Sequence, residues 1–237
     1  MIILSSDYDG TLKTRIHDLN INIREIQKYR KLGNIFILNT GRPFKSIKRE
    51  IDKFDIPFDY LCCNDGSVIF DQNLNIIKEN NLNQNQIRHI KNLMPHFPSF
   101  KIGHFYTAKE MLSEEISEPI EIEIIKPAKE KFSNFIDLLK CSEIELQYFA
   151  AKNSLYLKNN VSKSKALDEI ARIIDPSINP ATIYTIGDEG NDFEMIKNHH
   201  GFRMLESSPK LWLTTWRIVP EVHHLVKYLN HKSKKSK

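Results

Sequence analysis

The sequence predicts an α/β fold: a Rossmann-like, three-layer core with a parallel sheet between two layers of helices, and a small α+β module inserted into it. Two observations support this prediction. Near both ends of the 237-residue chain, short apolar runs alternate with segments of helical periodicity, as in parallel sheets that are buried on both faces. In the middle, apolar and polar residues alternate one by one, which is typical of antiparallel strands with one wet face.

The first half of the core is predicted from residues 2 to 63. Residues 2–4 are an apolar run that ends in polar residues, as in a buried strand that opens into a loop. A helix is expected to begin at Asn22, because Glu25 stands three residues later as in a capping box, and Gly33 is placed to end it. The next elements are a strand at residues 35–38, a helix with the apolar stripe Phe44, Ile47, Ile51 and Phe54, and a strand at Tyr60–Cys63.

The same rhythm returns after residue 160. The elements are a helix marked by Leu167, Ile170, Ala171 and Ile174, a strand at residues 183–186, and a helix that begins at Phe193. Further on, Trp212 and Trp216 lie four residues apart, the spacing of one helix face packed on the core. Sheets of this kind bind ligands outside the carboxyl ends of their strands.

Residues 82–160 form the predicted inserted module, a cap domain, and leave residues 1–81 and 161–237 as a discontinuous core domain. Alternation is clearest at residues 120–124, and it recurs at residues 144–149 and 155–157. Two helical stripes lie between these strands: Ile87, Ile90 and Met94, then Phe132, Phe135, Ile136 and Leu139.

Charge is concentrated at the end of the chain. There are 34 Lys and Arg residues against 30 Asp and Glu residues, a formal net charge of +4. Lys232, Lys234, Lys235 and Lys237 account for this excess, so the rest of the chain is formally neutral. A neutral body lacks the basic face of a nucleic-acid-binding domain. We expect the lysine-rich end to be a disordered, solubilising tail.

Cysteine usage and hydropathy indicate a cytoplasmic protein. Cys62, Cys63 and Cys141 show no Cys-x-x-Cys spacing, which argues against a disulfide framework and a zinc knuckle. No segment approaches the roughly 18 apolar residues of a membrane helix, and the first residues lack the pattern of a signal peptide.

Residues suited to phosphate chemistry follow the predicted strands. Asp7 and Asp9 come directly after the first strand, and Gly10 lets the chain leave its extended path there. Such a carboxylate pair can bind a hard cation and can divide the labour between nucleophile and acid. After the second strand, Thr40 and Gly41 offer a hydroxyl and free backbone N–H groups to an anion.

Two later segments complete the pattern. Asp188, Asn191 and Asp192 follow the late strand, at the same expected edge of the sheet. Lys163 and Lys165 stand just before a predicted helix. Acid pair, hydroxyl, lysine and acid pair together describe a magnesium-dependent phosphoryl-transfer site, where catalysis is mostly positioning and charge neutralisation.

These four segments, in this order, resemble the haloacid dehalogenase superfamily. The long insert resembles that of the Cof-like branch of sugar-phosphate and related phosphatases, and the resemblance extends from residue 1 to about residue 200. A second aspartate at Asp9 favours hydrolases and phosphomutases over relatives that cleave carbon–halogen bonds or act as ATP-driven pumps. The family pattern Val-x-Lys-x-x-Ala-Leu matches Val161, Lys163, Ala166 and Leu167, which favours Lys163 over Lys165.

The resemblance implies a role for each residue. Asp7 would be the nucleophile that forms an aspartyl-phosphate, and Asp9 would protonate the leaving alcohol and later activate water. The phosphoryl group would be bound by Thr40, Gly41, Lys163 and Asn191, and Mg²⁺ by Asp7, the backbone carbonyl of Asp9, Asp188 and Asp192. Arg42 is more often structural in this family and stays outside the catalytic set.

Asp65 departs from the family pattern. Cof-like relatives usually have Asn-Gly where this chain has Asp65-Gly66, at the edge of the substrate pocket. Asp65 would therefore add negative charge beside the leaving group. This favours a polyol or an amine-bearing leaving group.

The function that the resemblance implies is a Mg²⁺-dependent phosphatase of small phosphorylated metabolites, foremost sugar phosphates, as a monomer or homodimer. A phosphomutase of the same fold is the first alternative, in which the intermediate returns its phosphate to the sugar. A receiver-type signalling domain also uses an acidic cluster, a hydroxyl, a lysine and Mg²⁺. Its acceptor aspartate follows a middle strand, whereas Asp7 follows the first.

Overall fold

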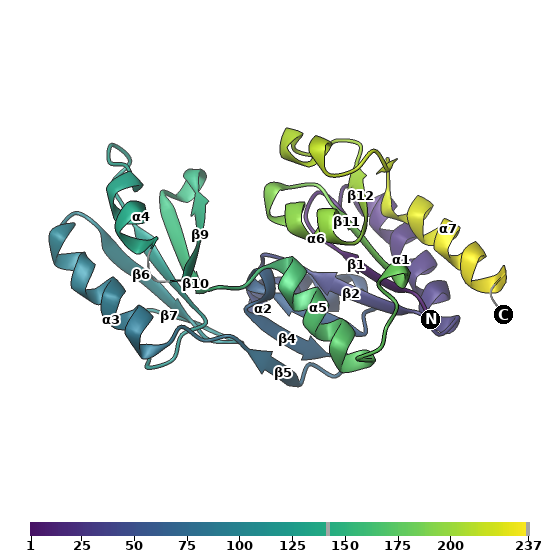
Figure 1. Cartoon of the computed structure of the whole chain (residues 1–237), viewed down its shortest axis with the longest axis horizontal. Coiled ribbons are helices and arrows are strands. Elements are labelled where there is room, and N and C mark those ends of the chain that lie inside the picture. Colours follow the sequence, from purple (N-terminus) through teal and green to yellow (C-terminus); the bar gives the residue numbers. More distant parts are fainter. Residues whose placement is uncertain (141–142, 236–237) are drawn as a thin grey trace.

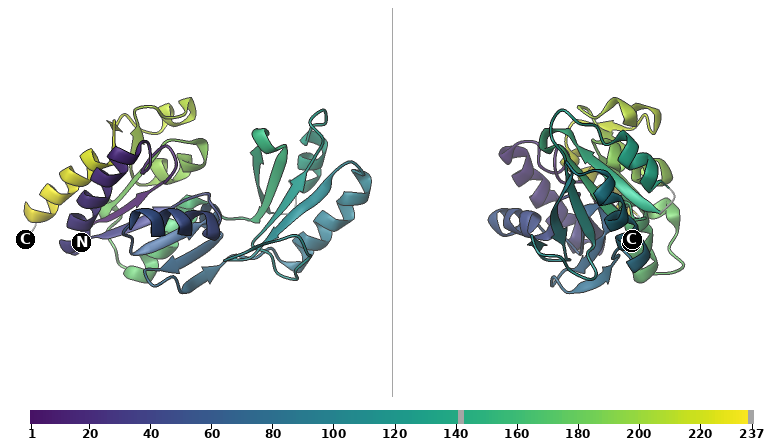
Figure 2. Two further views of the ribbon diagram at one scale, coloured as in Figure 1. Left: turned by 180° about the vertical axis from the view of Figure 1, so that it is seen from behind. Right: turned by 90° about the vertical axis from the view of Figure 1, so that its left-hand side faces the viewer.

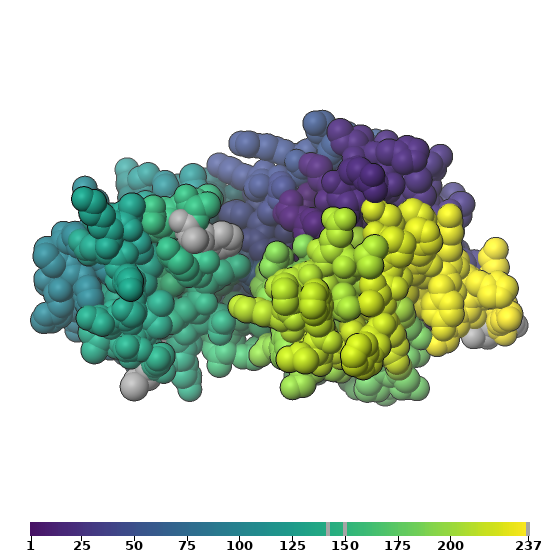
Figure 3. Space-filling view, turned by 90° about the horizontal axis from the view of Figure 1, so that it is seen from above, coloured from purple at the N-terminus to yellow at the C-terminus, as the bar shows by residue number. Residues whose placement is uncertain are grey.

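The computed structural model describes residues 1–140 and 143–235, apart from the side chains at positions 149 and 150. These residues form a larger core lobe and a smaller cap lobe that lie side by side (Figures 1 and 2). In the space-filling view, the teal cap lobe meets the core lobe along part of its facing side (Figure 3). The predicted α/β class with a parallel-sheet core is confirmed.

The core lobe is built on one sheet of eight strands in the order β13-β12-β11-β1-β2-β3-β4-β5. Neighbouring strands from β13 to β3 pair in parallel, and β4 and β5 add an antiparallel edge. The strands are β1 (Ile3–Ser6), β2 (Ile35–Asn39), β3 (Tyr60–Cys63), β4 (Val68–Asp71), β5 (Ile76–Glu79), β11 (Ile183–Gly187), β12 (His200–Met204) and β13 (Ile218–Val219).

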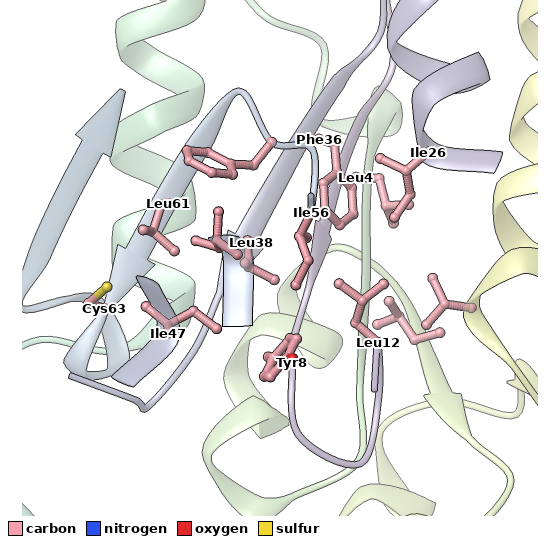
Figure 4. Close-up of a cluster of buried hydrophobic side chains, with 14 of the residues drawn as sticks. Leu4, Tyr8, Leu12, Ile26, Phe36, Leu38, Ile47, Ile56, Leu61 and Cys63 are labelled. Carbon is pink, nitrogen blue, oxygen red and sulfur yellow. The ribbon is translucent and has the colours of Figure 1, made fainter. Parts of the chain in front are cut away.

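Helices cover both faces of this sheet and bury its apolar side chains. On one face lie α1 (Ile16–Lys31), α2 (Phe44–Phe54) and α7 (Val222–Lys235), and on the other α5 (Lys163–Ile174) and α6 (Phe193–Asn198). Successive strand residues point to opposite faces, so Leu4 and Leu38 pack toward the first layer and Ile3 and Ile37 toward the second. Figure 4 shows part of the first of these clusters, including Leu4, Leu38 and Ile26.

The cap lobe contains a five-stranded antiparallel sheet in the order β7-β6-β8-β10-β9. Its elements are α3 (Gln84–Leu93), β6 (Lys101–Tyr106), β7 (Met111–Leu112), β8 (Glu121–Ile125), α4 (Ser133–Leu139), β9 (Ile144–Phe149) and β10 (Ser154–Asn159). The helices α3 and α4 lie on the side of the sheet that faces away from the core (Figure 1). All of these elements fall within residues 82–160; the domain boundaries themselves stay predictions.

One helix boundary was predicted wrongly. α1 begins at Ile16, not at Asn22. The side chain of Asn22 is buried: it donates to the carbonyl of Leu12 at 2.8 Å and accepts the backbone N–H of His223 at 2.7 Å. Asn22 therefore links the loop after β1 to α7 instead of capping a helix.

The end of the chain also differs from the prediction. α7 continues through Lys235, and Lys232 donates a hydrogen bond to the hydroxyl of Tyr184, so the lysine-rich segment is helical up to that residue. Lys237 lies outside the described residues. The two tryptophans do not pack on the core from one helix face, because Trp212 is 54% exposed and Trp216 is 91% exposed.

None of the helices in the described part of the chain has both the length and the apolar character needed to cross a membrane.

Candidate active site

Four neighbouring strands of the core sheet end at the candidate site. β11, β1, β2 and β3 run parallel and adjacent, so their carboxyl ends meet at one edge of the sheet. Asp188 follows β11, Asp7 follows β1 and Thr40 follows β2, while Asp65 lies in a short turn after β3. The polar residues that follow the predicted strands therefore share one region.

Three buried carboxylates converge there. Asp7, Asp188 and Asp192 each place one oxygen within 4.8 Å of the others. Asp192 also accepts the backbone N–H of Asp188 at 3.0 Å, and Thr11 donates its hydroxyl to Oδ1 of Asp188 at 2.6 Å. Hard oxygen donors at this spacing suit a divalent cation such as Mg²⁺.

Gly10 allows the loop after β1 to approach this cluster. Its φ is +76°, in the left-handed region, and a Cβ atom at this position would lie 2.2 Å from Oδ2 of Asp188. A larger residue would displace the Asp188 carboxylate.

Lys163 lies at the centre of the cluster. Its Nζ is 2.5 Å from Oδ1 of Asp7 and 2.7 Å from Oδ1 of Asp192, and the lysine side chain is completely buried. The other candidate, Lys165, is exposed and donates to the backbone carbonyl of Asn160 at 3.2 Å. Of the two lysines, only Lys163 contacts the carboxylates in the described residues.

Burial and the repulsion between carboxylates raise the pKa values of Asp7 and Asp188. Desolvation raises the pKa of Asp7 well above its ordinary value, although the charge of Lys163 lowers it. Desolvation also raises the pKa of Asp188 to about 6, against the hydrogen bond from Thr11. Burial lowers the pKa of Lys163, but the charges of Asp192 and Asp7 outweigh this and raise it above its ordinary value. The single positive charge of Lys163 cannot balance the negative charges of three carboxylates. A bound divalent cation would supply the missing positive charge.

The carboxylate of Asp9 is held apart from these three. Arg42 donates to both of its oxygens, from Nε at 2.6 Å and from Nη2 at 2.5 Å, and the Asp9 side chain is 55% exposed. The guanidinium also lies over the ring of Tyr8, 5.1 Å from its centroid. Arg42, which lies outside the predicted catalytic set, contacts Asp9 in the structure.

The loop after β2 packs closely on Asp65. The hydroxyl of buried Thr40 accepts the backbone N–H of Arg42 at 3.1 Å, and a Cβ on Gly41 would lie 2.9 Å from Oδ1 of Asp65. Asn191 donates its side-chain amide to the same oxygen at 2.8 Å. Thr40, Gly41, Asp65 and Asn191 thus form one side of the candidate site.

Asp65 is paired with a lysine of the cap. Nζ of Lys158, near the end of β10, lies 2.6 Å from Oδ2 of Asp65, and both side chains are buried. Burial raises the pKa of Asp65, but the charge of Lys158 outweighs it and lowers the pKa to about 2. The negative charge expected beside the leaving group is therefore neutralised, and it no longer favours an amine-bearing leaving group. Lys158 was not predicted, because nothing local in the sequence marks its partner, 93 residues away.

A comparison of the sequence with protein-family models agrees with the arrangement of the candidate site. A family model for haloacid dehalogenase-like hydrolases matches residues 4–145 and 155–215, most of the chain. The chain belongs to this family. The resemblance that the motifs carried is confirmed, and the receiver-type alternative is set aside because the whole domain plan is that of the hydrolases.

Solved structures share the fold of this haloacid dehalogenase-like hydrolase. They include the phosphatase BT1666 from Bacteroides thetaiotaomicron, with 19% identity, a TM-score of 0.80, and coverage of 98% of this chain and 94% of that one. A protein from Plasmodium vivax described as a HAD/COF-like hydrolase has 15% identity, a TM-score of 0.74, and coverage of 100% and 96%. The sucrose-phosphatase from Synechocystis sp. PCC6803 has 17% identity, a TM-score of 0.68, and coverage of 97% of both chains. Comparison with curated proteins gives no match.

Proposed function

We propose that this hydrolase is a Mg²⁺-dependent phosphatase of small phosphorylated metabolites, with sugar phosphates as the foremost substrates. The observation that carries the proposal is the contact of Lys163 with Asp7 and Asp192, beside Asp188, at the carboxyl ends of adjacent strands. A nucleophilic carboxylate, a fixed cation and a site for a divalent metal are the parts that phosphoryl transfer requires.

In the proposed reaction, an oxygen of Asp7 attacks the phosphorus atom, and the bond from phosphorus to the leaving oxygen breaks. Asp9 gives its proton to that oxygen, so an alcohol departs and an aspartyl-phosphate remains. Asp9 then takes a proton from water, whose oxygen attacks the phosphorus; inorganic phosphate leaves and Asp7 is restored. Since Arg42 holds both oxygens of Asp9, Asp9 must exchange this partner for the substrate before it can act.

The remaining residues bind and orient the phosphoryl group. Lys163 offsets the negative charge between Asp7 and the phosphoryl oxygens, and Thr40 and Asn191 supply hydrogen bonds from two sides. Asp7, Asp188 and Asp192 would hold Mg²⁺ together with the backbone carbonyl of Asp9. When bound, the ion supplies positive charge that draws electron density from the phosphoryl oxygens.

The face of the cap sheet that α3 and α4 leave uncovered supports a hydroxyl-rich leaving group. Register places Glu121 opposite Lys158 and Glu123 opposite Tyr156, so these polar side chains share that face. Two contacts tie it to the core beside the candidate site: Lys158 with Asp65, and the amide of Asn64 with Oε1 of Glu121 at 3.2 Å.

Further along this face, Oε2 of Glu123 lies 2.6 Å from Nδ1 of His104, and the hydroxyl of Tyr156 donates to Oε1 at 3.0 Å. Carboxylate, imidazole, phenol and amide groups together match the donors and acceptors of a sugar. They offer little to a long aliphatic leaving group, which would bury polar groups without partners.

The test is hydrolysis of p-nitrophenyl phosphate by the wild type, by Asp7→Asn and by a matched control, Asp52→Asn. Asp52 is an exposed carboxylate on α2 that pairs with Lys48, so its change to an amide leaves the site intact. We expect Mg²⁺-dependent activity in the wild type and in Asp52→Asn, loss of activity with chelator, and no turnover by Asp7→Asn. Equal rates in all proteins and conditions would refute the mechanism.

Substrate and reaction type follow from a panel of phosphorylated sugars, nucleotides and cofactors. Release of inorganic phosphate, without isomerisation of the sugar, separates the phosphatase from the phosphomutase alternative. A preference of kcat/KM for nucleotides over all sugar phosphates would refute the sugar assignment and leave the phosphatase assignment in place.

A further inference from the structure

A groove lies on the core lobe, between the edge of the sheet and α7. It has a volume of about 400 Å³, within the range of small-molecule sites. We call it the aromatic groove, and it is lined by Tyr184, His200, Phe202, Arg217, Val219, His224, Leu225, Tyr228 and Lys232.

Strand pairing and helix periodicity bring these side chains together. Tyr184 on β11 pairs with His200 on β12, and Phe202 follows two residues later on the same face. Leu225 and Tyr228 stand three residues apart on α7, so they lie on one side of that helix. The groove is thus formed by one sheet face and one helix face.

The sheet side of the groove is aromatic. The rings of Tyr184 and His200 stack with centroids 5.1 Å apart and planes at 23°, and Phe202 lies 6.4 Å from Tyr184. Tyr228 on the helix side is 55% exposed. Flat rings along a groove favour a flat ring as ligand, because stacking buries apolar area on both partners.

The charges of the groove have one sign. Its charged side chains are those of Arg217 and Lys232, and none of the lining residues carries a carboxylate. The guanidinium of Arg217 lies over the ring of Phe202, 5.9 Å from its centroid, and it makes no hydrogen bond or ion pair within the described residues. An arginine that stacks on a ring and keeps its donors available is suited to a carboxylate, sulfonate or phosphate.

The aromatic groove is separate from the candidate active site. Tyr184 and His200 lie at the amino-terminal ends of β11 and β12, whereas Asp188 follows the carboxyl end of β11. Four residues of extended chain between Tyr184 and Asp188 correspond to about 13 Å. One small molecule in the groove therefore leaves the catalytic carboxylates free.

We infer that the aromatic groove is a second ligand site, which binds a planar aromatic anion. The ring stacks against Tyr184, His200 and Phe202, and the anionic group pairs with Arg217. A second copy of this chain is the other occupant that the test must distinguish.

The probe is 2-naphthoate, which carries no phosphoryl group to compete for the active site, and 2-naphthol is its uncharged match. Binding is measured by isothermal titration calorimetry with the wild type, Arg217→Gln, Phe202→Leu and the control Arg172→Gln, an exposed arginine on α5. Thermal unfolding checks that each variant is folded, and sedimentation velocity gives its oligomeric state. Arg217 is exposed, so its replacement spares the core.

We expect 2-naphthoate to bind the wild type and Arg172→Gln alike, with one site per chain, and to bind Arg217→Gln at least about fivefold more weakly. Phe202→Leu should weaken binding likewise, and 2-naphthol should bind more weakly than 2-naphthoate. Saturating 2-naphthoate should leave the KM for p-nitrophenyl phosphate unchanged. No binding at about 10 mM probe, equal affinity in all variants, or competitive inhibition of p-nitrophenyl phosphate hydrolysis by 2-naphthoate would overturn the inference. So would a wild-type dimer that Arg217→Gln dissociates, since the groove would then hold a second copy.

Discussion

Replacing Lys158 by methionine tests how the cap is held on the core. The substitution keeps the length of the side chain and removes the charge, so the carboxylate of Asp65 stays buried without its cation. Asn191 still donates to that carboxylate, but a neutral amide does not replace a charge. We expect Lys158→Met to lower the free energy of unfolding by about 3 to 5 kcal/mol at pH 7, the usual cost of breaking a buried ion pair.

The pKa of Asp65 gives an independent magnitude. The difference between its ordinary value of 3.8 and about 2 in the folded protein corresponds to about 2 to 3 kcal/mol. Because folding lowers this pKa, the contribution is complete above about pH 5 and is lost as the pH falls toward 2. Roughly half of it remains at pH 3.

The assay is a double-mutant cycle of Lys158→Met, Asp65→Asn and the double variant, with urea unfolding followed by circular dichroism at pH 7 and pH 3. We expect a coupling energy of about 2 to 3 kcal/mol at pH 7 that falls by about half at pH 3. Lys101→Met, an exposed lysine on β6, serves as control and should stay within about 0.5 kcal/mol of the wild type. A coupling near zero, or one that does not change between the two pH values, would refute the reasoning.

Three further predictions concern the candidate active site. Lys163→Met should lower kcat for p-nitrophenyl phosphate by at least about 10²-fold, because the buried cation beside Asp7 is lost. The surface variant Lys165→Met should keep a kcat within about twofold of the wild type. The reverse pattern would contradict the assignment of Lys163. Asp9→Asn should lower kcat by about 10²- to 10⁴-fold. It should leave the rise in Tm on addition of Mg²⁺ unchanged, because the Asp9 carboxylate pairs with Arg42 and is not part of the acidic cluster. Loss of that rise in Tm would show that the Asp9 side chain binds the metal. Folding raises the pKa of Asp188 to about 6, so the metal-free protein loses stability as the pH rises from about 4 to about 6. Mg²⁺ should therefore raise Tm more at pH 7.5 than at pH 5 in differential scanning fluorimetry. Equal increases in Tm at both pH values would exclude this account.

Strand and helix periodicity predicted much of the fold because buried elements leave a local pattern. The strand β3 at Tyr60–Cys63, the strand β9 at Ile144–Phe149 and the helix α2 at Phe44–Phe54 coincide with the predicted segments. Parallel topology then explains why residues after different strands meet, since all carboxyl ends share one edge. The positions of Asp7 and Asp188 follow from that rule alone.

Two of the errors arose where a polar residue has a distant partner. Asn22 has the sequence context of a helix cap, but its amide is used by Leu12 and by α7, two hundred residues later along the chain. Asp65 suggested excess negative charge, and the compensating Lys158 comes from the cap. Local sequence describes what a polar group can do and not which partner it finds, because the partner is chosen by tertiary packing.

Two of the buried lysines, Lys158 and Lys163, lie in acidic regions that differ in their charge balance. Lys158 lies 2.6 Å from Asp65 and 3.5 Å from the buried carboxylate of Glu121. The pKa of Asp65 falls to about 2 and burial raises the pKa of Glu121 to about 7, so below pH 7 the lysine faces one full negative charge and is nearly balanced without a ligand. Lys163 faces Asp7 and Asp192 with Asp188 nearby, and the pKa values of Asp7 and Asp188 rise, so this cluster is left with unbalanced negative charge. An unbalanced buried cluster costs stability unless a cation joins it. The difference separates a pair that links the cap to the core from the cluster that we propose binds a metal and a phosphoryl group.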